Sequence, residues 1–393
     1  MKIIVGLPSR NESKSIRNVV CQIDQTLQGA KLSSNLDIII VNADCESDDH
    51  TSVLFSTTET FLPKISLSCS LGKGNAILRI MKFAVEEENA DGIILIDTDI
   101  PQVPKAWLEA FLQLAHEGFD LVLPRRKPLW NAGDLTYQIC FPVLTALWGV
   151  DMRNPIAGEV FISRRLIKKC LEVEWHRHSL GYGVDFLISN IGSSLKWGEV
   201  YLSTTKGNPL RSFHLDSDGN IRMGRKFYDV LESVIYFSRS RLCQPPPKSI
   251  HYSTIDYVSW DADQVHVNSE LESLALNVQR SFNSIANYRT FLGDDLTDHL
   301  LKFRCVGKSF KGISLEVWYE CLSWTIRFYD PIKLSDCNKK LLETLFLSRV
   351  VGHYFEIIGT SQWYDGIISS ATLLFEKRLI LFDWYSDAND TDL

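Results

Sequence analysis

The sequence predicts an α/β protein, with a Rossmann-like, mostly parallel sheet that has helices on both faces and is followed by a helical region. Short apolar runs rich in β-branched residues alternate with helical patterns through the first half of the chain, which is typical of a doubly wound layer. Polar, turn-rich loops follow these runs, at the sheet edge where such layers bind ligands. After the proline-rich segment Cys243–Lys248 the alternation disappears. We therefore expect two domains, 1–225 and 226–393.

Composition limits the class of protein. The chain has 393 residues, of which 45% are hydrophobic and 23% are charged, as in an ordinary globular protein. Its net charge of −7 gives no reason to expect nucleic acid as a partner. Nine cysteines without a CxxC pair fit a reducing compartment better than a disulfide framework or a zinc site.

The N-terminus and the apolar runs indicate a cytoplasmic protein. The first residues, MKIIVG, lack the apolar core and cleavage site of a signal peptide and are predicted to start a strand. The longest apolar run, 140–150, contains Pro142 and is too short to cross a bilayer, so no transmembrane segment is expected. A homo-oligomer is compatible with these features.

Apolar periodicity places the elements of both regions. Strands are expected at 2–7, 36–41, 92–96, 119–123, 160–162 and 197–202. Helices of the first region are expected at 15–27, 76–87, 106–116, 135–148 and 186–191. Helices of the second region are expected at 227–242, 270–286, 314–328, 339–358 and 366–379. Aromatic residues of the second region are predicted to be core, because large apolar side chains are usually buried; they include Trp318, Trp324, Tyr354, Trp363 and Trp384.

Two carboxylates follow the buried strand at 92–96. Residues i and i+2 of an extended chain point to the same side, so Asp97 and Asp99 can reach one point in space. Oxygen ligands at the carboxyl end of a strand suit a hard cation such as Mg²⁺ or Mn²⁺, with substrate phosphates completing its shell. The alternative is a polar strand end that only exits to solvent.

Two further loops carry candidate nucleotide-binding residues. Asp44, in the polar loop 42–51, can accept hydrogen bonds from a base or a ribose hydroxyl, and the alternative is a helix cap or an Asx turn. Gly72 and Gly74 allow close approach of the backbone at a helix start, where Lys73 adds a charge suited to a diphosphate. Asp185 also lies at a helix start, where it is either a cap or a functional group.

Six motifs, in this order, resemble those of the GT-A glycosyltransferases. Within that group they look most like the retaining enzymes that make glucosyl-3-phosphoglycerate and the related mannosylglycerate synthases. They are LPSRNE (Leu7–Glu12), the Asp44 loop with Ser47, Asp49 and Thr51, GKGNA (Gly72–Ala76), IDTD (Ile96–Asp99), PIAGEVFISRR (Pro155–Arg165) and GYGVD (Gly181–Asp185). The helical tail is similar in size and character to that of the mannosylglycerate enzymes, without a matching motif.

The resemblance implies roles for the matching residues. Pro8 and Glu12 would border the nucleotide, Asp44 would read the base, and Lys73 would hold the diphosphate. Residues of the last two motifs would line or position the sugar and the acceptor: Ala157, Gly158, Glu159, Tyr182, Gly183 and Asp185. Transfer with retention would need no dedicated protein base. In an inverting enzyme, Asp185 would be the general base.

The resemblance also implies a divalent metal, Mg²⁺ or Mn²⁺. Asp99 would bind it, and Asp97 would face the metal or the ribose. The family supplies a third ligand, a histidine, soon after the strand ending near Leu202, but Lys206-Gly207-Asn208 occupies that place. Either His214 reaches the metal, or Asn208 substitutes, or metal binding is weakened. The Asp44 loop departs too, with Cys45 and Glu46 where the family has acidic or amide and glycine residues.

The function implied is transfer of a hexose from a nucleoside diphosphate sugar, UDP-glucose or GDP-mannose in type, to a small acceptor such as glycerate or 3-phosphoglycerate. Arg125, Arg126 and Arg211 favour an anionic acceptor. One alternative is a sugar-phosphate nucleotidyltransferase, although Pro8–Glu12 stands where such an enzyme carries a glycine-rich loop. Another is a binding protein that keeps the fold without catalysis, which the missing histidine would explain.

Overall fold

The computed structural model describes residues 1–33, 36–126, 133–202, 213–215, 221–252, 269–303, 310–330, 336–358, 360 and 363–383. The chain forms two compact units. Unit 1 consists of Met1–Lys127, Met152–Gly207 and Tyr252–Tyr257, and unit 2 consists of Pro128–Asp151, Asn208–His251 and Val258–Leu393. This division differs from one at 225/226 chiefly because the segment 128–151 groups with the helical unit.

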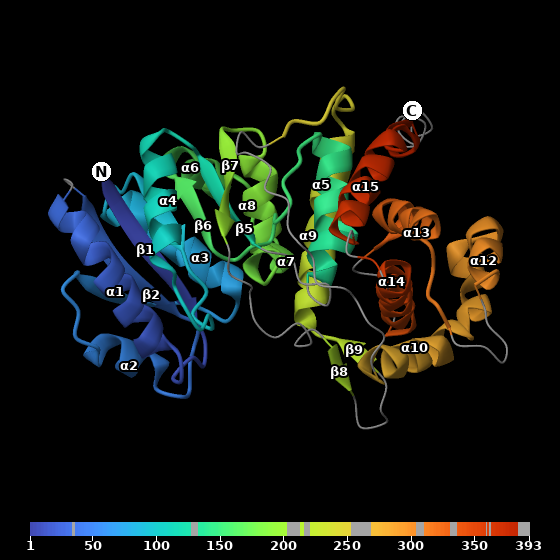
Figure 1. Cartoon of the computed structure of the whole chain (residues 1–393), viewed down its shortest axis with the longest axis horizontal. Helices are drawn as coiled ribbons and strands as arrows, with labels where there is room; N and C mark the ends of the chain where they lie inside the picture. The colour runs from blue at the N-terminus through green and yellow to red at the C-terminus, as the bar shows by residue number, and fades with distance from the viewer. Residues whose placement is uncertain are drawn as a thin grey trace. The chain divides into compact units, whose positions relative to one another are not determined.

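Unit 1 is built on a seven-stranded sheet with the order β3-β2-β1-β4-β6-β5-β7 (Figure 1). The strands are β1 (Lys2–Ser9), β2 (Asp37–Asp44), β3 (Lys64–Ser68), β4 (Gly92–Leu95), β5 (Leu121–Arg126), β6 (Val160–Ser163) and β7 (Trp197–Leu202). Every pairing is parallel except the two that β6 makes, with β4 and with β5. The predicted mostly parallel sheet is therefore confirmed, with one reversed strand that the sequence pattern did not indicate.

Helices cover both faces of this sheet (Figure 1). They are α1 (Ile16–Ser33), α2 (Thr51–Thr57), α3 (Lys73–Lys82), the π-helical turn η1 (Phe83–Glu87), α4 (Lys105–His116), α6 (Arg164–Glu172), α7 (Arg177–Leu180) and α8 (Val184–Gly192). Side chains alternate between the faces of a strand, so neighbouring residues of one strand meet different helices. Gly6 of β1 faces Ile80 of α3, and Leu121 of β5 lies against Gly192 of α8.

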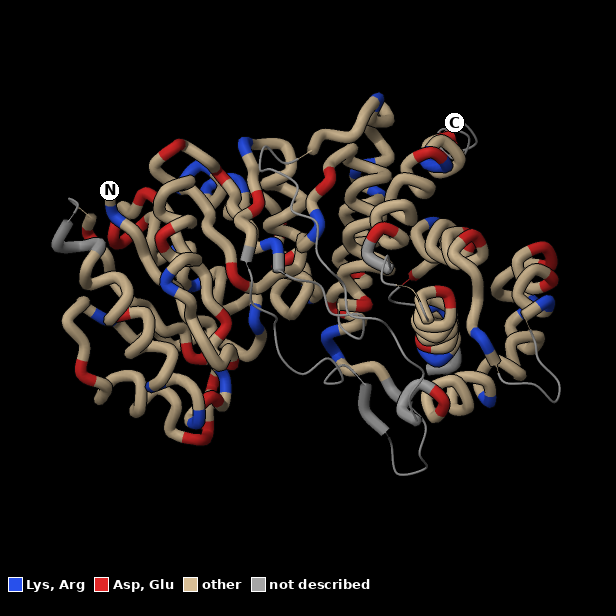
Figure 2. The backbone as a smooth tube through the Cα atoms, in the orientation of Figure 1, with Lys and Arg blue, Asp and Glu red and all other residues tan. Residues whose placement is uncertain are grey.

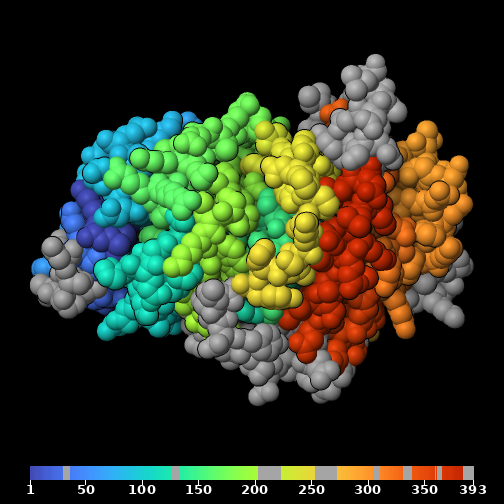
Figure 3. Space-filling model, turned by 90° about the horizontal axis from the view of Figure 1, so that it is seen from above, coloured from blue at the N-terminus to red at the C-terminus, as the bar shows by residue number. Residues whose placement is uncertain are grey.

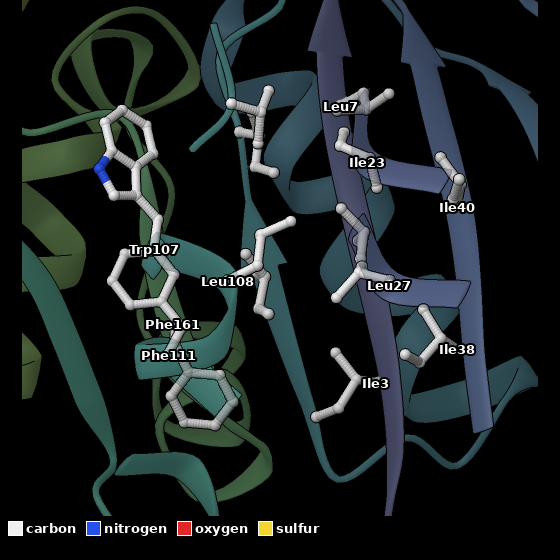
Figure 4. Packing of buried hydrophobic residues seen from close by; sticks show 14 of the residues in the cluster. Ile3, Leu7, Ile23, Leu27, Ile38, Ile40, Trp107, Leu108, Phe111 and Phe161 are labelled. Atoms are coloured by element: carbon white, nitrogen blue, oxygen red, sulfur yellow. The ribbon is translucent and has the colours of Figure 1, made fainter. Parts of the chain in front are cut away.

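The main core of unit 1 lies between the helices α1 and α4 and the face of the sheet that is turned away from α3. Ile23 and Leu27 of α1 lie over the strands, where Ile3 of β1 points toward them (Figure 4). Phe111 of α4 and Phe161 of β6 extend the same cluster (Figure 4). Burial of this apolar surface, at about 25 cal/mol per Å², is what fixes the strand ends that carry the candidate site.

Where unit 2 is described, it is helical apart from a two-stranded ribbon, β8 (Phe213–Leu215) with β9 (Ile221–Met223). Its helices are the π-helical turn η2 (Thr136–Cys140), α5 (Phe141–Trp148), α9 (Arg225–Leu242), α10 (Ser269–Phe282), η4 (Ile285–Tyr288), α11 (Arg289–Leu292), α12 (Asp294–Leu301), α13 (Leu315–Phe328), α14 (Asp336–Ile357) and α15 (Trp363–Glu376). The expected α/β class with a helical second region is confirmed.

Aromatic side chains form much of the core of unit 2. Trp318, Trp324 and Tyr354 are buried as predicted, and the Trp318 indole donates a hydrogen bond of 2.7 Å to the backbone oxygen of Gln138. The side chains of Trp363 and Trp384 lie outside the described residues. The C-terminal helices form a stripe on the surface of this unit, red in Figure 3 between yellow and orange segments.

Charged residues of both signs are interspersed along both units (Figure 2). Across the described ranges, no helix combines the length and the apolar character that a bilayer crossing requires.

Candidate functional site

The carboxyl ends of β1, β2 and β4 meet at one edge of the sheet in unit 1. The parallel register pairs Ser9, the last residue of β1, with Asp44, the last residue of β2. Thr98, three residues after β4, donates a hydrogen bond of 3.3 Å to the backbone oxygen of Pro8. The segments that hold Pro8, Asp44 and the two aspartates after β4 are therefore neighbours, as the sequence predicted.

Asp44 is engaged within its own loop. One carboxylate oxygen accepts the Ser47 hydroxyl at 2.6 Å, and the other accepts the Ser47 backbone N–H at 3.1 Å. These bonds reach three residues along the chain, one more than an Asx turn, and no helix starts at this point. They hold the carboxylate at the strand end and leave its half-buried side chain at the sheet edge.

A second carboxylate joins the loops after β1 and β2. Asp49 accepts the Ser13 backbone N–H at 2.9 Å and the Thr51 backbone N–H at 3.1 Å. Burial would raise the pKa of Asp49, but the hydrogen bonds from Thr51 and Ser13 outweigh it and hold the pKa at about 2. Glu12 belongs to the same junction, because its N–H donates to Thr51 and its carboxylate accepts the Ser15 hydroxyl.

Lys73 lies between two carboxylates. Its Nζ is 3.0 Å from Asp97 Oδ1 and 3.0 Å from Asp185 Oδ2, and the three side chains are only 15%, 18% and 13% exposed. Burial alone would lower the pKa of Lys73, but the carboxylates of Asp185 and Asp97 outweigh it and raise the pKa above its usual range. The first residue of α3, the segment after β4 and the first turn of α8 thus meet at one ammonium group.

Gly158 lies directly against Asp97. The antiparallel register pairs Leu95 of β4 with Val160 of β6, and continuing it by two residues sets Asp97 opposite Gly158. Gly158 has φ +83°, and a Cβ built there would be 2.3 Å from Asp97 Oδ2. Only glycine fits this position, both for its backbone conformation and for the space that the carboxylate takes.

The glycine-lysine turn, which consists of Gly72, Lys73 and Gly74, packs on the segment that contains α7. Gly74 donates its N–H to the backbone oxygen of Gly181 at 3.0 Å. A Cβ on Gly74 would lie 1.9 Å from the Ser179 oxygen, and one on Gly72, whose φ is +135°, would lie 2.4 Å from the Leu180 oxygen. Because the two segments are more than a hundred residues apart, no local sequence signal indicated this contact, and α7 was not predicted.

His178 supports the loop that follows α7. Its backbone oxygen accepts the N–H groups of Gly181 and Gly183. Burial, together with the neighbouring His176, lowers the pKa of His178 to about 4, so its imidazole is neutral at pH 7. Between the two glycines, the ring of Tyr182 is exposed, and Gly183 is buried as the N-cap of α8.

The remaining candidates differ in exposure. Asp99 is exposed and lies in a turn beyond the end of β4, so it does not continue the strand as expected. Glu159 and Ala157 are buried beside Gly158. Arg125 is buried too, with Nη1 3.9 Å from Glu199 Oε2.

Some candidates lie outside the described residues, namely Asn208, Arg211 and the side chains of Arg126 and His214. Among the described residues, no group of three or more His, Cys, Asp or Glu side chains is arranged to hold a metal ion. Asp97 and Asp99 nevertheless offer carboxylate oxygens of the kind that Mg²⁺ and Mn²⁺ prefer, with phosphate and water as usual co-ligands.

Comparison with known proteins gives structural neighbours alone. No protein-family model matches the chain, and no curated protein matches it. The chain is similar to the solved structure of glucosyl-3-phosphoglycerate synthase from Mycobacterium tuberculosis with Mn²⁺, UDP-glucose and phosphoglyceric acid, at 21% identity and a TM-score of 0.45, covering 60% of this chain and 79% of that chain. The same enzyme with Mg²⁺ and UDP matches at 21% identity, 60% and 79% coverage and a TM-score of 0.46. With Mn²⁺ and UDP-glucose it matches at 19% identity, 57% and 86% coverage and a TM-score of 0.42.

Proposed function

We propose that this protein is a metal-dependent glycosyltransferase. It would move a hexose from a nucleoside diphosphate sugar, UDP-glucose or GDP-mannose in type, to a small anionic acceptor such as glycerate or 3-phosphoglycerate, with retention at the anomeric carbon. The observation that carries this proposal is the convergence of Lys73, Asp97 and Asp185 at the carboxyl edge of the sheet, with Gly158 against Asp97.

Lys73 is the group that would meet the leaving diphosphate. The departing nucleotide gathers negative charge as its bond to the sugar breaks, and a fixed positive charge in a site of low dielectric stabilises that charge strongly. The two carboxylates keep the ammonium protonated and hold it in one place. The positive end of the α3 dipole lies at Lys73 and also favours phosphate.

Asp99 and Asp97 would hold the divalent cation. Both are oxygen donors from one strand end, and the ion would supply further positive charge to the diphosphate when bound. In the cluster itself, two carboxylates face one ammonium, so the three groups carry a net charge of −1. This surplus of negative charge favours a cation. His214 or Asn208 would be a third ligand.

The remaining residues would position the two substrates. Asp44, Pro8 and Glu12 lie where the first two strands end, at the edge where a nucleotide binds in such layers. Asp185 is held by Lys73 and would orient hydroxyl groups, together with the exposed ring of Tyr182. In a retaining transfer the acceptor approaches on the face of the leaving group, whose oxygen can take the proton, so these residues need not act as a base.

A screen of donors and acceptors tests this proposal. Purified protein is incubated with UDP- and GDP-sugars, Mn²⁺ or Mg²⁺, and glycerate or 3-phosphoglycerate, and release of UDP or GDP is measured. NMR of the product gives its anomeric configuration. We expect nucleotide release that depends on both acceptor and metal, with the anomeric configuration of the donor kept. Nucleotide binding in calorimetry without turnover would instead support a binding protein.

Substitution of the predicted metal ligand sharpens this test. We expect Asp99→Ala to abolish transfer while the protein stays folded, because the exposed side chain contributes little to the core. Glu109→Ala, an exposed carboxylate of α4, is the matched control and should keep full activity. Normal metal-dependent turnover in Asp99→Ala would contradict the assignment.

A further inference from the structure

Two cysteines that are far apart in sequence lie next to each other at the same sheet edge. The parallel register of β2 and β3 pairs Asp44 with Ser68, the last residues of these strands. The residues that follow the two strands are Cys45 and Cys69. Their sulfur atoms are 3.3 Å apart. Neighbouring strands are about 4.8 Å apart, which lies within the Cα separation of about 4.4 to 6.8 Å found in disulfides.

The pair is accessible from one side. Cys45 is 3% exposed, while Cys69 is half-buried and is followed by the exposed Ser70. A small oxidant can therefore reach Cys69, with Cys45 directly behind it. Of the other described cysteines, Cys21 is also half-buried, and Cys243 is on the surface with its sulfur 3.6 Å from the Arg239 oxygen.

The two thiols are hydrogen-bonded to each other, with 3.3 Å between their sulfur atoms. This bond lowers the pKa of Cys45 and, with burial, raises the pKa of Cys69. The thiolate is the reactive form in disulfide chemistry, so the lowered pKa of Cys45 suits it to attack a mixed disulfide on its neighbour Cys69.

We propose that Cys45 and Cys69 form a reversible disulfide on exposure to a small disulfide such as oxidised glutathione. Cys69 loses its proton and its sulfur attacks one sulfur of the oxidant, and one glutathione leaves as the thiolate and takes up a proton. Cys45 then loses its proton and attacks the Cys69 sulfur of the mixed disulfide, which releases the second glutathione. The two cysteines give up two electrons, and the oxidant gains two electrons and two protons.

The disulfide would act on the glycine-lysine turn. Cys45 Sγ is 3.3 Å from the backbone oxygen of Gly72, and Cys69 Sγ is 3.4 Å from that of Asp44. A disulfide has no S–H to donate, so both carbonyls lose this partner. Gly72 has no room to shift toward the Leu180 oxygen, and Lys73 follows it directly. The consequence for nucleotide affinity rests on the proposed function, whereas formation of the disulfide does not.

Thiol counting and peptide mapping test the disulfide itself. Reduced full-length protein is incubated with oxidised glutathione, denatured and titrated for free thiols. We expect the count to fall from nine to seven, a digest peptide pair linking Cys45 to Cys69, and recovery of all nine with dithiothreitol. Cys45→Ser and Cys69→Ser should each abolish the linked peptide, and the surface control Cys243→Ser should keep it. A retained count of nine, or glutathione on Cys69 without the linked peptide, would overturn the proposal.

Calorimetry with UDP and GDP in the presence of Mn²⁺ tests the effect on the site. We expect the oxidised form to bind the preferred nucleotide at least threefold more weakly than the reduced form, with no such difference in Cys69→Ser. Equal affinity of the two forms would refute control of the site by the disulfide. If neither form binds a nucleotide, the proposed function fails, while the linked peptide still decides the disulfide.

Discussion

Among the described residues, each unit has a largely buried cation that carboxylates hold, Lys73 in unit 1 and Arg349 in unit 2, and the two clusters are built differently. In unit 2, Arg349 is 1% exposed. Its guanidinium donates to Gln138 Oε1 and the Ile313 backbone oxygen, at 3.0 Å each, and to both carboxylate oxygens of Glu356. In unit 1, Lys73 meets two carboxylates that come from two other segments of the chain, and these are 18% and 13% exposed, against 44% for Glu356.

The difference teaches which cluster is structural and which is suited to a ligand. Arg349 and Glu356 lie on one helix, and an amide oxygen and a backbone oxygen accept two further bonds from the guanidinium, so one carboxylate balances its charge. Around Lys73 the charge is unbalanced by one carboxylate, and the partners arrive through tight loops rather than a helix face. A balanced pair supports the fold, whereas a cluster with a surplus carboxylate favours a cation.

The largest effect expected from this comparison is loss of catalysis at Lys73. We expect Lys73→Met to reduce kcat by about 10²- to 10³-fold, because the leaving diphosphate loses a fixed positive charge. The measurement is nucleotide release at saturating donor. Lys82→Met, an exposed lysine in the last turn of the same helix, should leave the rate unchanged. A rate within threefold of wild type for Lys73→Met would contradict the claim that the Lys73 cluster is functional and differs in this from the Arg349 cluster.

Arg349 should behave in the opposite way. We expect Arg349→Met to lower the free energy of unfolding by about 3 kcal/mol, because Gln138 and the Ile313 carbonyl lose a buried donor. Urea unfolding followed by circular dichroism measures this change. The exposed Arg280→Met serves as control and should change the free energy by less than about 0.5 kcal/mol. An unfolding midpoint equal to wild type would show that the pair is dispensable.

Substitution of Gly158 should reduce activity less than substitution of Lys73. We expect Gly158→Ala to reduce kcat/KM by about 30-fold, since the new methyl group meets Asp97 and the backbone keeps a φ unfavourable to alanine. The exposed helical Gly29 has no atom within contact of a built Cβ, so Gly29→Ala should stabilise the protein by about 0.5 to 1 kcal/mol without changing the rate. Full activity of Gly158→Ala would mean that Asp97 can move freely.

Asp49 should give the smallest effect, visible only in acid. Its pKa in the folded protein is about 2, below the ordinary 3.8, so the carboxylate contributes stability above pH 4 that is lost as the pH falls from 4 toward 2. Water screens this half-buried group, so we expect a contribution of about 1 kcal/mol or less. The free energy of unfolding, measured from pH 5 to pH 2, should fall less steeply with pH in Asp49→Asn than in the wild type. An identical slope in the variant would exclude this contribution.

Local patterns predicted most of the sheet because its strands are fully buried. The runs near β1, β2 and β4 were largely apolar, and each strand was found within three residues of its expected bounds. The edge strand β3 was missed because KISLS is short and partly exposed, which leaves no apolar run to detect. Helix α3 begins at Lys73 rather than at Ala76, so the glycine-lysine turn is already part of the helix.

Contacts between distant segments could not be predicted from such patterns. Lys73 was expected at the diphosphate and Asp97 at the metal or the ribose, but their ion pair, and that of Lys73 with Asp185, depend on how three segments meet. The pairing of Cys45 with Cys69 depends on the register of an edge strand that was not predicted. The roles of Asp44 and of His214 with the nucleotide and the metal stay predictions.

The reversed direction of β6 determines which end of that strand faces the ligand edge. In a strand parallel to β4, the residues before its start would lie at the far edge of the sheet, away from Asp97. Because β6 runs the other way, the chain comes back from unit 2 at residue 152 and enters the sheet at its ligand edge, with Gly158 two residues before the strand. Pairing of β6 with β4 fixes the position of Gly158, whatever the length of the segment 128–151 that precedes it in unit 2. Insertions or deletions in that segment can therefore alter unit 2 without displacing this glycine.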